Sequence, residues 1–404
     1  MSNVALAVGV TLATQTIVAT AIIAPSVIAP AAASDLGVAP QSVGLIVALA
    51  YTLAMVSGLT VGGLLTRFGP LRTCQVAVLL GAAGLALGAP GSIALVLCAA
   101  ALIGYGYGMV TPTSSHILVQ SAPRERLAFI FSIKQTGVPI GGALAGALIP
   151  PLVLAFGWHR TLLVLAAACA LTAIAMQPAR ARFDQRREPA RATSWAQIVA
   201  PVKLVAATPA LRMLAALSLV YAQVQLAFVT YFVSFLNLEL GLTLVAAGLI
   251  YAVAHAASIV GRIAWGAVAD RILSPRRVLS ALGLVSGLCG VATAMAAPAW
   301  STTALIVLSA VYGASAVGWN GVYLAEVARS APEGQVGAAT GGTQFFTFSG
   351  ALSGPPLFAA LVWLTDGYRA GFVCFAVLPF LVGMWLLFSA RPRSPASGPM
   401  ETLR

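Results

Sequence analysis

The chain has 404 residues, of which 60% are hydrophobic and 8% are charged, and its formal net charge is +12. An average soluble domain carries about 25% charged residues, so this chain would expose very large apolar patches in water. The composition therefore argues against a soluble enzyme, a nucleic-acid-binding protein and a disordered protein. The apolar runs continue for about twenty residues without polar alternation, which fits a membrane-spanning helix and not a barrel strand.

These runs predict an all-α membrane protein with twelve transmembrane helices. We expect the helices at 6–30, 41–64, 73–90, 93–118, 128–155, 161–178, 210–236, 244–268, 277–297, 302–325, 335–363 and 370–390.

Basic side chains gather in alternate gaps between these runs, for example Arg67 and Arg72, whereas the opposite gaps contain only Arg160 and Arg369. The positive-inside rule then places both termini and the central loop in the cytoplasm of a multi-pass inner (plasma) membrane protein. The long polar stretch divides the chain into two six-helix bundles with a loop and a tail, which we expect at 1–178, 179–208, 209–390 and 391–404.

The two halves contain an internal repeat. The sequence GGLLTR at 62–67 aligns with GAVADR at 266–271, and SAP at 121–123 aligns with SAP at 330–332. Each half has an even number of spans, so both copies enter the membrane in the same sense and form a parallel repeat.

The two aligned loops resemble the G-x-L-x-D-R signature of the major facilitator superfamily. This resemblance implies a transporter that works by alternating access, and it implies a gating role for the loop residues and for a nearby acid. The first copy has Thr66 where the family has an acid. The expected gating residues are Gly62, Arg67, Gly266, Asp270, Arg271 and Glu326.

Two cations lie well inside predicted spans, and a charge inside the membrane is costly enough to suggest a function. Lys134 is about 10 Å and Arg262 about 12 Å from the cytoplasmic ends of their spans at 1.5 Å per residue. None of the ten acids lies within a span, so the missing anion is expected to be the substrate. Alternatively, both side chains extend to the interface, or Arg262 pairs with Asp270 or Glu326.

The segment around Arg262 also resembles the eighth span of the oxalate/formate and monocarboxylate porters, whose arginine there binds carboxylate. Monocarboxylate porters tend to have an acid where this chain has Ser258, and oxalate/formate antiporters have a lysine in span eleven, where this chain has Gln344. The predicted function is secondary transport of a small mono- or dicarboxylate, by exchange or proton-linked symport. We expect Lys134 and Arg262 to form a two-sided clamp around the anion.

Neutral polar residues in the spans complete the expected substrate site, and His255 is on the same helical face as Arg262 because seven residues are about two turns. The further expected substrate-binding residues are Gln135, Gln344, His255, Tyr51, Gln15 and Asn320. We expect a monomer in the lipid bilayer with an anionic substrate, and neither a nucleic-acid partner nor a cofactor nor a metal.

Two other functions are consistent with the sequence. The segment 134–142 partly resembles the G-P-x-x-G-G motif of drug/proton antiporters, which export lipophilic compounds, and a non-transporting receptor of the same fold would leave no trace in the composition. No hydrolase, metalloprotease or phosphate-loop motif is present in the sequence, so we do not expect an enzyme.

Overall fold

A computed structural model describes residues 3–121, 123, 127–184, 195–333 and 335–388. The expected tail 391–404 and residues 185–194 of the expected central loop lie outside the described residues.

The first half consists of helices that follow the apolar runs, because a helix satisfies its own backbone hydrogen bonds within lipid. Its elements are α1 (Asn3–Leu36), η1 (Pro40–Ser42), α2 (Val43–Thr60), α3 (Gly62–Phe68), α4 (Pro70–Gly88), α5 (Ile93–Ser121), α6 (Leu127–Gln135) and α7 (Gly137–Ala175).

The second half follows after three short elements: η3 (Gln177–Ala179), α8 (Arg180–Phe183) and α9 (Trp195–Ala207). Its own elements are α10 (Pro209–Ser234), the π-helical turn η4 (Phe235–Glu239), α11 (Leu244–Arg271), α12 (Pro275–Met295), α13 (Thr302–Tyr312), the π-helical turn η5 (Gly313–Val317), α14 (Asn320–Ser330), α15 (Val336–Thr365) and α16 (Tyr368–Phe388).

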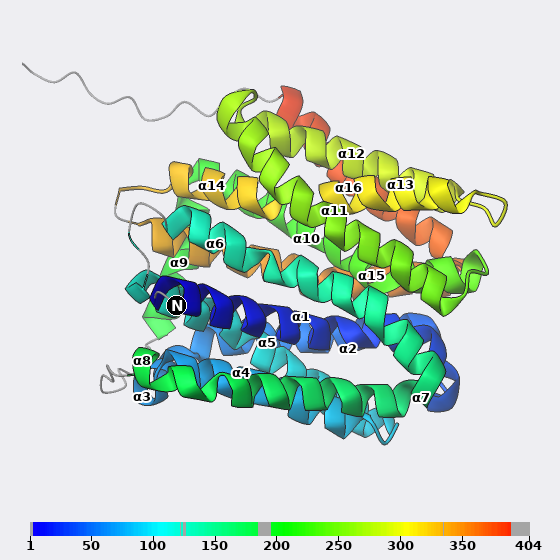
Figure 1. The fold of residues 1–404 in the computed structure, drawn as a ribbon. Helices are drawn as coiled ribbons and strands as arrows, with labels where there is room; N and C mark the ends of the chain where they lie inside the picture. The colour runs from blue at the N-terminus through cyan, green and yellow to red at the C-terminus, as the bar shows by residue number, and fades with distance from the viewer. Residues whose placement is uncertain (1–2, 122, 124–126, 185–194, 334, 389–404) are drawn as a thin grey trace, which may run out of the picture.

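The described residues contain eleven helical segments that are long and apolar enough to cross a membrane. One of them, Ile130–Phe183, has 54 residues, and a helix of that length would be about twice as long as a bilayer is thick. Gly157, with φ of 74°, interrupts α7 between the predicted fifth and sixth spans. The chain turns back at this point (Figure 1), so the expected fold of twelve crossings in two bundles is confirmed.

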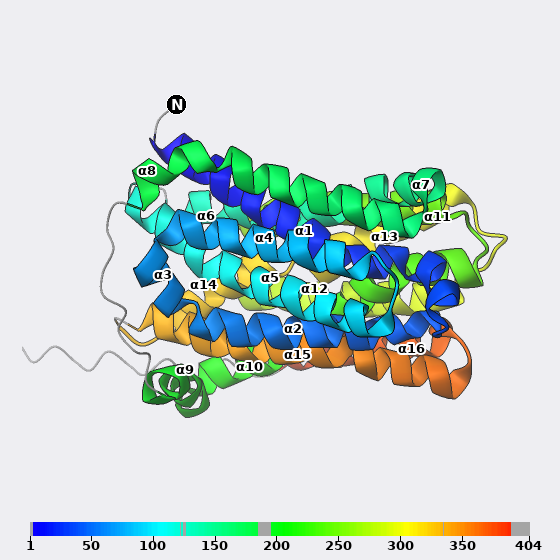
Figure 2. The same cartoon turned by 90° about the horizontal axis from the view of Figure 1, so that it is seen from below.

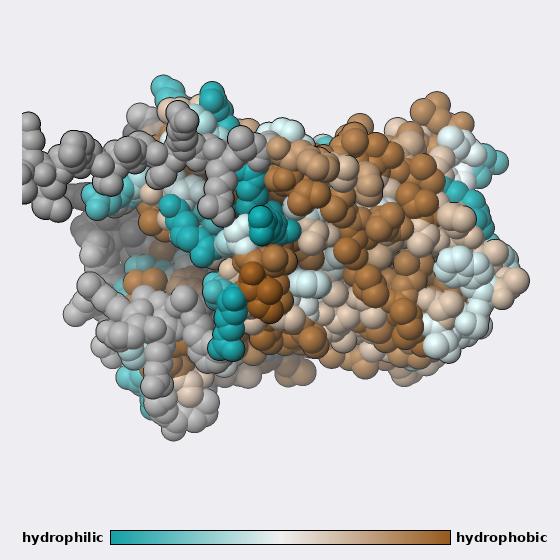
Figure 3. All heavy atoms as spheres, turned by 90° about the horizontal axis from the view of Figure 1, so that it is seen from above, coloured by the Kyte–Doolittle hydropathy of each residue, from teal (hydrophilic) through white to brown (hydrophobic). Residues whose placement is uncertain are grey.

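Figures 1 and 2 show the two halves side by side with their helices roughly parallel. One end of the molecule carries the start of α1 together with α3, α8 and α9, and we call it the terminal face. The opposite end, which carries the segment between α1 and α2 and the turn within α7, is called the loop face. Apolar residues cover the middle of the surface in Figure 3, with polar residues toward both ends. Such a belt fits a protein that is surrounded by lipid.

Three features of the structure differ from the sequence-based expectation. The second predicted span, 41–64, ends at Thr60 and is followed by the separate helix α3, and the tenth span is interrupted by η5. The predicted loop 179–208 contains the helix α9, which packs against α15: a Cβ at Gly342 would touch the carbonyl group of Pro201.

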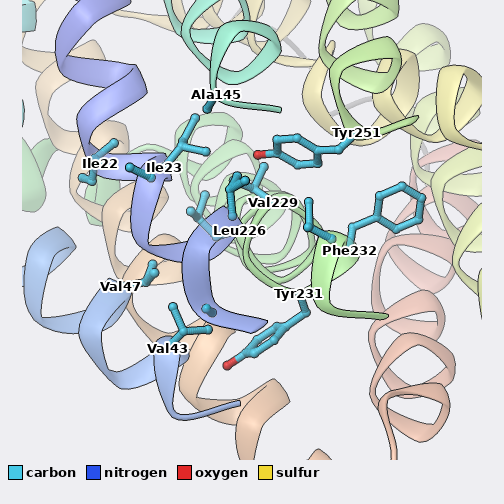
Figure 4. Close-up of a cluster of buried hydrophobic side chains, with 14 of the residues drawn as sticks. Ile22, Ile23, Val43, Val47, Ala145, Leu226, Val229, Tyr231, Phe232 and Tyr251 are labelled. Carbon is cyan, nitrogen blue, oxygen red and sulfur yellow. The ribbon is translucent and has the colours of Figure 1, made fainter. Parts of the chain in front are cut away.

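The largest cluster of buried side chains joins the two halves. It contains residues of α1, α2 and α7 from the first half and residues of α10 and α11 from the second. Figure 4 shows part of it, with Ile22, Ile23, Val43, Val47, Ala145, Leu226, Val229, Tyr231, Phe232 and Tyr251 labelled. The halves therefore share a continuous apolar core.

Candidate functional site

A stripe of three residues on α11 faces the first half of the molecule. Gly248, His255 and Arg262 are spaced by seven residues, which is about two helical turns, so they lie on one face. Their neighbours on α6 and α7 are Gly146, Gly142 and Gln135, in the reverse order along the chain. The two helices therefore run antiparallel along the seam between the halves.

Close contacts at glycine residues hold this seam together toward its loop-face end. A Cβ at Gly146 would lie 2.5 Å from the carbonyl oxygen of Gly248, and a Cβ at Gly142 would lie 2.6 Å from Cγ of His255. Only glycine allows such close approach between helices, as is common in membrane proteins.

Arg262 forms the contact of this stripe that lies nearest the terminal face. Its Nη1 donates to the carbonyl oxygen of Gln135 at 3.0 Å, and its Nη2 donates to the carbonyl oxygen of Val317 at 3.1 Å. Gln135 belongs to the first half and Val317 to the second, so the half-buried guanidinium links the two.

Lys134 is fully buried, and its Nζ lies 3.4 Å from Oε1 of Gln135. It is one turn after Ile130, which packs in a cluster with Leu71 and Cys74 of α4, so it lies on the face of α6 that is turned to the interior of the first half. The expected two-sided clamp is therefore not formed in this conformation: Gln135 separates the two cations, with its amide on Lys134 and its carbonyl on Arg262.

In the part of the chain that the structure describes, neither cation has a carboxylate partner. The ion pairs found there are Arg180–Asp184, Arg329–Glu326 and Arg369–Glu239. The alternative pairing of Arg262 with Asp270 or Glu326 is thus not seen, and neither side chain extends to an acid at the interface.

Several buried polar atoms along the seam have no hydrogen-bond partner among the described residues. They are Oε1 of Gln15, the hydroxyl of Tyr251, both ring nitrogens of His255 and Nε of Arg262. Gln15 lies against the break between α6 and α7, where a Cβ at Gly137 would be 2.8 Å from its Cβ. Buried polar groups normally have hydrogen-bond partners, so a polar ligand at this place could form hydrogen bonds with these atoms.

The remaining expected substrate-binding residues lie on other helices. Tyr51 on α2 packs edge-to-face with Tyr107 on α5, with ring centroids 5.7 Å apart. Asn320 donates to Oε1 of Gln225 at 3.3 Å and thereby joins α14 to α10. Gln344 is half-buried on α15.

The first copy of the expected gating loop forms α3 and the turn after it. Gly62 begins α3, and the guanidinium of Arg67 lies 5.1 Å from the centre of the Phe68 ring. Asp184, which the sequence analysis did not select, anchors this loop: its carboxylate accepts the backbone N–H groups of Leu71 at 2.8 Å and Arg72 at 3.1 Å. It thus caps the first turn of α4.

The second copy of the loop ends α11, where Asp270 and Arg271 are exposed and Gly266 has open space around it. The acid expected near this copy, Glu326, is 3.1 Å from Nε of Arg329 on its own helix. Residues three apart are neighbours on a helix, so in this conformation the carboxylate of Glu326 pairs with Arg329 on its own helix.

Tyr231 is a contact between the halves that sequence reasoning missed. Its hydroxyl lies 2.8 Å from the carbonyl oxygen of Pro355 and 3.1 Å from that of Gln41, and its ring stacks on Phe358 with centroids 4.5 Å apart. Gln41 belongs to the first half, so Tyr231 closes the seam at the loop face. A tyrosine near the end of an apolar span gives no signal in the sequence that distinguishes this role.

The chain as a whole is similar to known proteins in sequence and in fold. The family model described as Major Facilitator Superfamily matches residues 10–355. Monocarboxylate transporter 13 of Rattus norvegicus is 28% identical over 316 residues, which cover 76% of this chain and 70% of the relative, and the Bos taurus protein of the same name is also 28% identical, covering 76% and 71%.

Solved structures show the same fold at low sequence identity. A POT family transporter in complex with 5-aminolevulinic acid superposes with a TM-score of 0.75 at 14% identity, covering 94% of this chain and 95% of that one. A bacterial homolog of the human lysosomal transporter Spinster gives a TM-score of 0.73 at 15% identity, covering 96% and 98%.

Proposed function

The chain belongs to the Major Facilitator Superfamily, and on that premise we propose that it carries a small organic anion, a mono- or dicarboxylate, across the membrane by alternating access. The observation that carries this proposal is the position of Arg262 and its hydrogen bonding. Its guanidinium lies on the seam between the halves, it contacts carbonyl oxygens, and its buried Nε has no partner among the described residues.

A cation in this position favours an anionic substrate. Carbonyl dipoles stabilise a guanidinium but leave its net charge uncompensated, and a charge inside the membrane is costly. A carboxylate would supply the opposite charge, and it matches the planar two-donor edge of arginine. The similarity to proteins named monocarboxylate transporters supports the same class of substrate.

Lys134 and Gln135 contribute to this site in a different way from a clamp. Because Oε1 of Gln135 accepts from Lys134, the amide nitrogen of Gln135 remains available to donate to an anion. The buried ammonium adds positive potential behind this amide. Lys134 thus orients Gln135, and Arg262 binds the carboxylate directly.

The proposal also includes the orientation of the protein in the membrane and the energy coupling of transport. The terminal face is cytoplasmic, the protein lies in the inner (plasma) membrane as a monomer, and transport is exchange or symport in which a proton moves with the anion. His255, buried with both ring nitrogens unpartnered among the described residues, is the side chain proposed to carry a proton if the protein itself binds one.

Uptake into proteoliposomes tests the proposal. Radiolabelled mono- and dicarboxylates are compared with lipophilic cations, and we expect only the carboxylates to accumulate. Arg262→Lys should reduce uptake by tenfold or more despite keeping the charge, because one carboxylate hydrogen bond to a charged donor is worth about 1.5–3 kcal/mol. Lys134→Met should act more weakly, through Gln135.

Three results would overturn this function. Near-normal carboxylate uptake by Arg262→Ala would remove the residue on which the proposal depends. Accumulation of lipophilic cations alone would favour a drug/proton antiporter, and binding without any transport would favour a receptor.

A further inference from the structure

The carbonyl group of Gln135 is free to accept from Arg262 because of a proline. In an α-helix each carbonyl accepts the N–H of the residue four positions later. The residue four positions after Gln135 is Pro139, which has no N–H. Accordingly α6 ends at Gln135, α7 begins at Gly137, and the Gln135 carbonyl accepts from Nη1 of Arg262 at 3.0 Å.

The second acceptor of Arg262 also lies at a helix irregularity. Val317 is the last residue of the π-helical turn η5, and its carbonyl accepts from Nη2 at 3.1 Å. Such turns change the hydrogen-bond register of a helix and are frequent at functional sites. The guanidinium therefore lies between two interruptions of the helical backbone, one in each half of the molecule.

This arrangement fixes the guanidinium without using its whole donor capacity. A guanidinium has five N–H donors. The two hydrogen bonds to carbonyl oxygens come from Nη1 and Nη2, whereas Nε is buried and has no partner among the described residues. Nε and the neighbouring Nη together form the edge that binds a carboxylate with two parallel hydrogen bonds. The carbonyls thus hold the group while one donor of this edge, Nε, has no partner among the described residues.

We propose that Pro139 is a positioning residue for the substrate: by removing one N–H it exposes the Gln135 carbonyl, which presets Arg262 with its Nε edge free for a carboxylate. This inference rests on the proposed function, in which Arg262 binds the anion. Because Gln135 and Arg262 belong to different halves, the preset geometry exists only while the seam is closed at this level.

Two variants, Pro139→Ala and Pro139→Gly, restore the missing N–H, so that Gln135 can bond within its own helix. Alanine and glycine have opposite helix propensities, so an effect shared by both variants identifies the N–H and not helix stability. The matched control is Pro151→Ala, a proline in the same helix that is exposed. Each protein is first checked for a monodisperse elution profile.

The first measurement is independent of transport. Phenylglyoxal reacts with guanidinium groups, and its incorporation at Arg262 is followed by mass spectrometry of the peptide that contains this residue. A hydrogen bond from a charged donor is worth enough to slow the reaction about tenfold, so both Pro139 variants should react about tenfold faster than the wild type and Pro151→Ala at the wild-type rate. Gln135→Ala keeps the backbone carbonyl and should retain the protection.

The second measurement is uptake of radiolabelled pyruvate, a small monocarboxylate. Both Pro139 variants should raise KM about tenfold with kcat changed less, because the guanidinium is no longer preset. Wild-type phenylglyoxal reactivity in both variants would overturn the role of Pro139. Faster reactivity in a protein that carries no carboxylate would keep the positioning role and instead refute the proposed function.

Discussion

The crossing of α7 and α11 provides a way to shift the protein between its conformations. Gly146 and Gly248 meet at this crossing, and a Cβ at Gly146 would lie 2.5 Å from the Gly248 carbonyl oxygen, 2.9 Å from Cδ1 of Tyr251 and 3.0 Å from the nitrogen of Ala252. Ordinary contacts begin at 3.4 Å, so Gly146→Ala requires the two helices to move apart by about 1 Å. Two of these three obstacles are backbone atoms, which cannot rotate away.

The cost of this substitution depends on the conformation. Overpacking of this kind costs about 1–3 kcal/mol, and it arises only while the halves touch near the loop face. Separation of the halves near the loop face removes this overpacking cost. A bias of about 1–3 kcal/mol corresponds to a shift of about 5- to 150-fold toward a conformation open at the loop face.

Cysteine labelling measures this shift. Val43 is 4% exposed and belongs to the apolar cluster that joins the halves, so a cysteine at this position reacts slowly while the loop face is closed. In a chain whose five native cysteines are replaced by serine, Gly146→Ala should speed the reaction of Val43→Cys with a maleimide that does not cross the membrane. The reagent is added on the side of the loop face.

The matched control is Gly341→Ala on α15, where an added Cβ meets nothing within 4 Å. It introduces the same methyl group into a helix without touching the seam, so its labelling rate should equal that of the parent chain. If Gly146→Ala were labelled no faster than Gly341→Ala, the α7–α11 crossing would not hold the loop face closed and the reasoning would fail.

Two further substitutions test single contacts. Tyr231→Phe removes the hydroxyl that lies near the Gln41 and Pro355 carbonyls. It should raise the Val43→Cys labelling rate by about two- to tenfold, because a neutral hydrogen bond is worth about 0.5–1.5 kcal/mol. An unchanged rate would show that the stacked ring alone closes the seam. Asp184→Ala removes the cap of α4 and should lower the free energy of unfolding by about 0.5–2 kcal/mol. This loss is measured as a lower melting temperature in detergent, and a wild-type melting temperature would contradict the capping role.

Much of the fold follows from the sequence because lipid leaves few choices. A backbone in hydrocarbon must form helices, so the apolar runs determine the number and order of the spans. The sharp turn inside α7 falls at Gly157, between the two expected spans, since glycine tolerates the positive φ found there. The interruptions at Thr60 and at η5 are not visible in the hydropathy, because both lie within continuous apolar runs.

The candidate site is predictable only where spacing along one helix decides the outcome. The seven-residue spacing predicts that His255 and Arg262 share one helical face, and their contacts with Gly142 and Gln135 turn this face toward the first half. The orientation of Lys134 depends instead on how α6 packs against α4. Ile130, one turn before Lys134, packs in a cluster with Cys74, which is 56 positions away in the sequence. The cap by Asp184 joins residues 113 positions apart, a distance at which no local pattern carries information.

The position of Arg262 links substrate binding to the movement of the halves. The first half supplies one of its two carbonyl acceptors, through Gln135, and the second half supplies the other, through Val317. When the halves separate at this level, the buried cation loses the Gln135 acceptor, and an unmade hydrogen bond to a charged group is costly. The empty protein is therefore stabilised in the conformation in which the halves meet at the level of Arg262. In the proposed function, a carboxylate on the Nε edge would replace the lost acceptor and also neutralise the charge. We therefore expect the loaded protein to change conformation more readily than the empty one, as the proposed exchange requires.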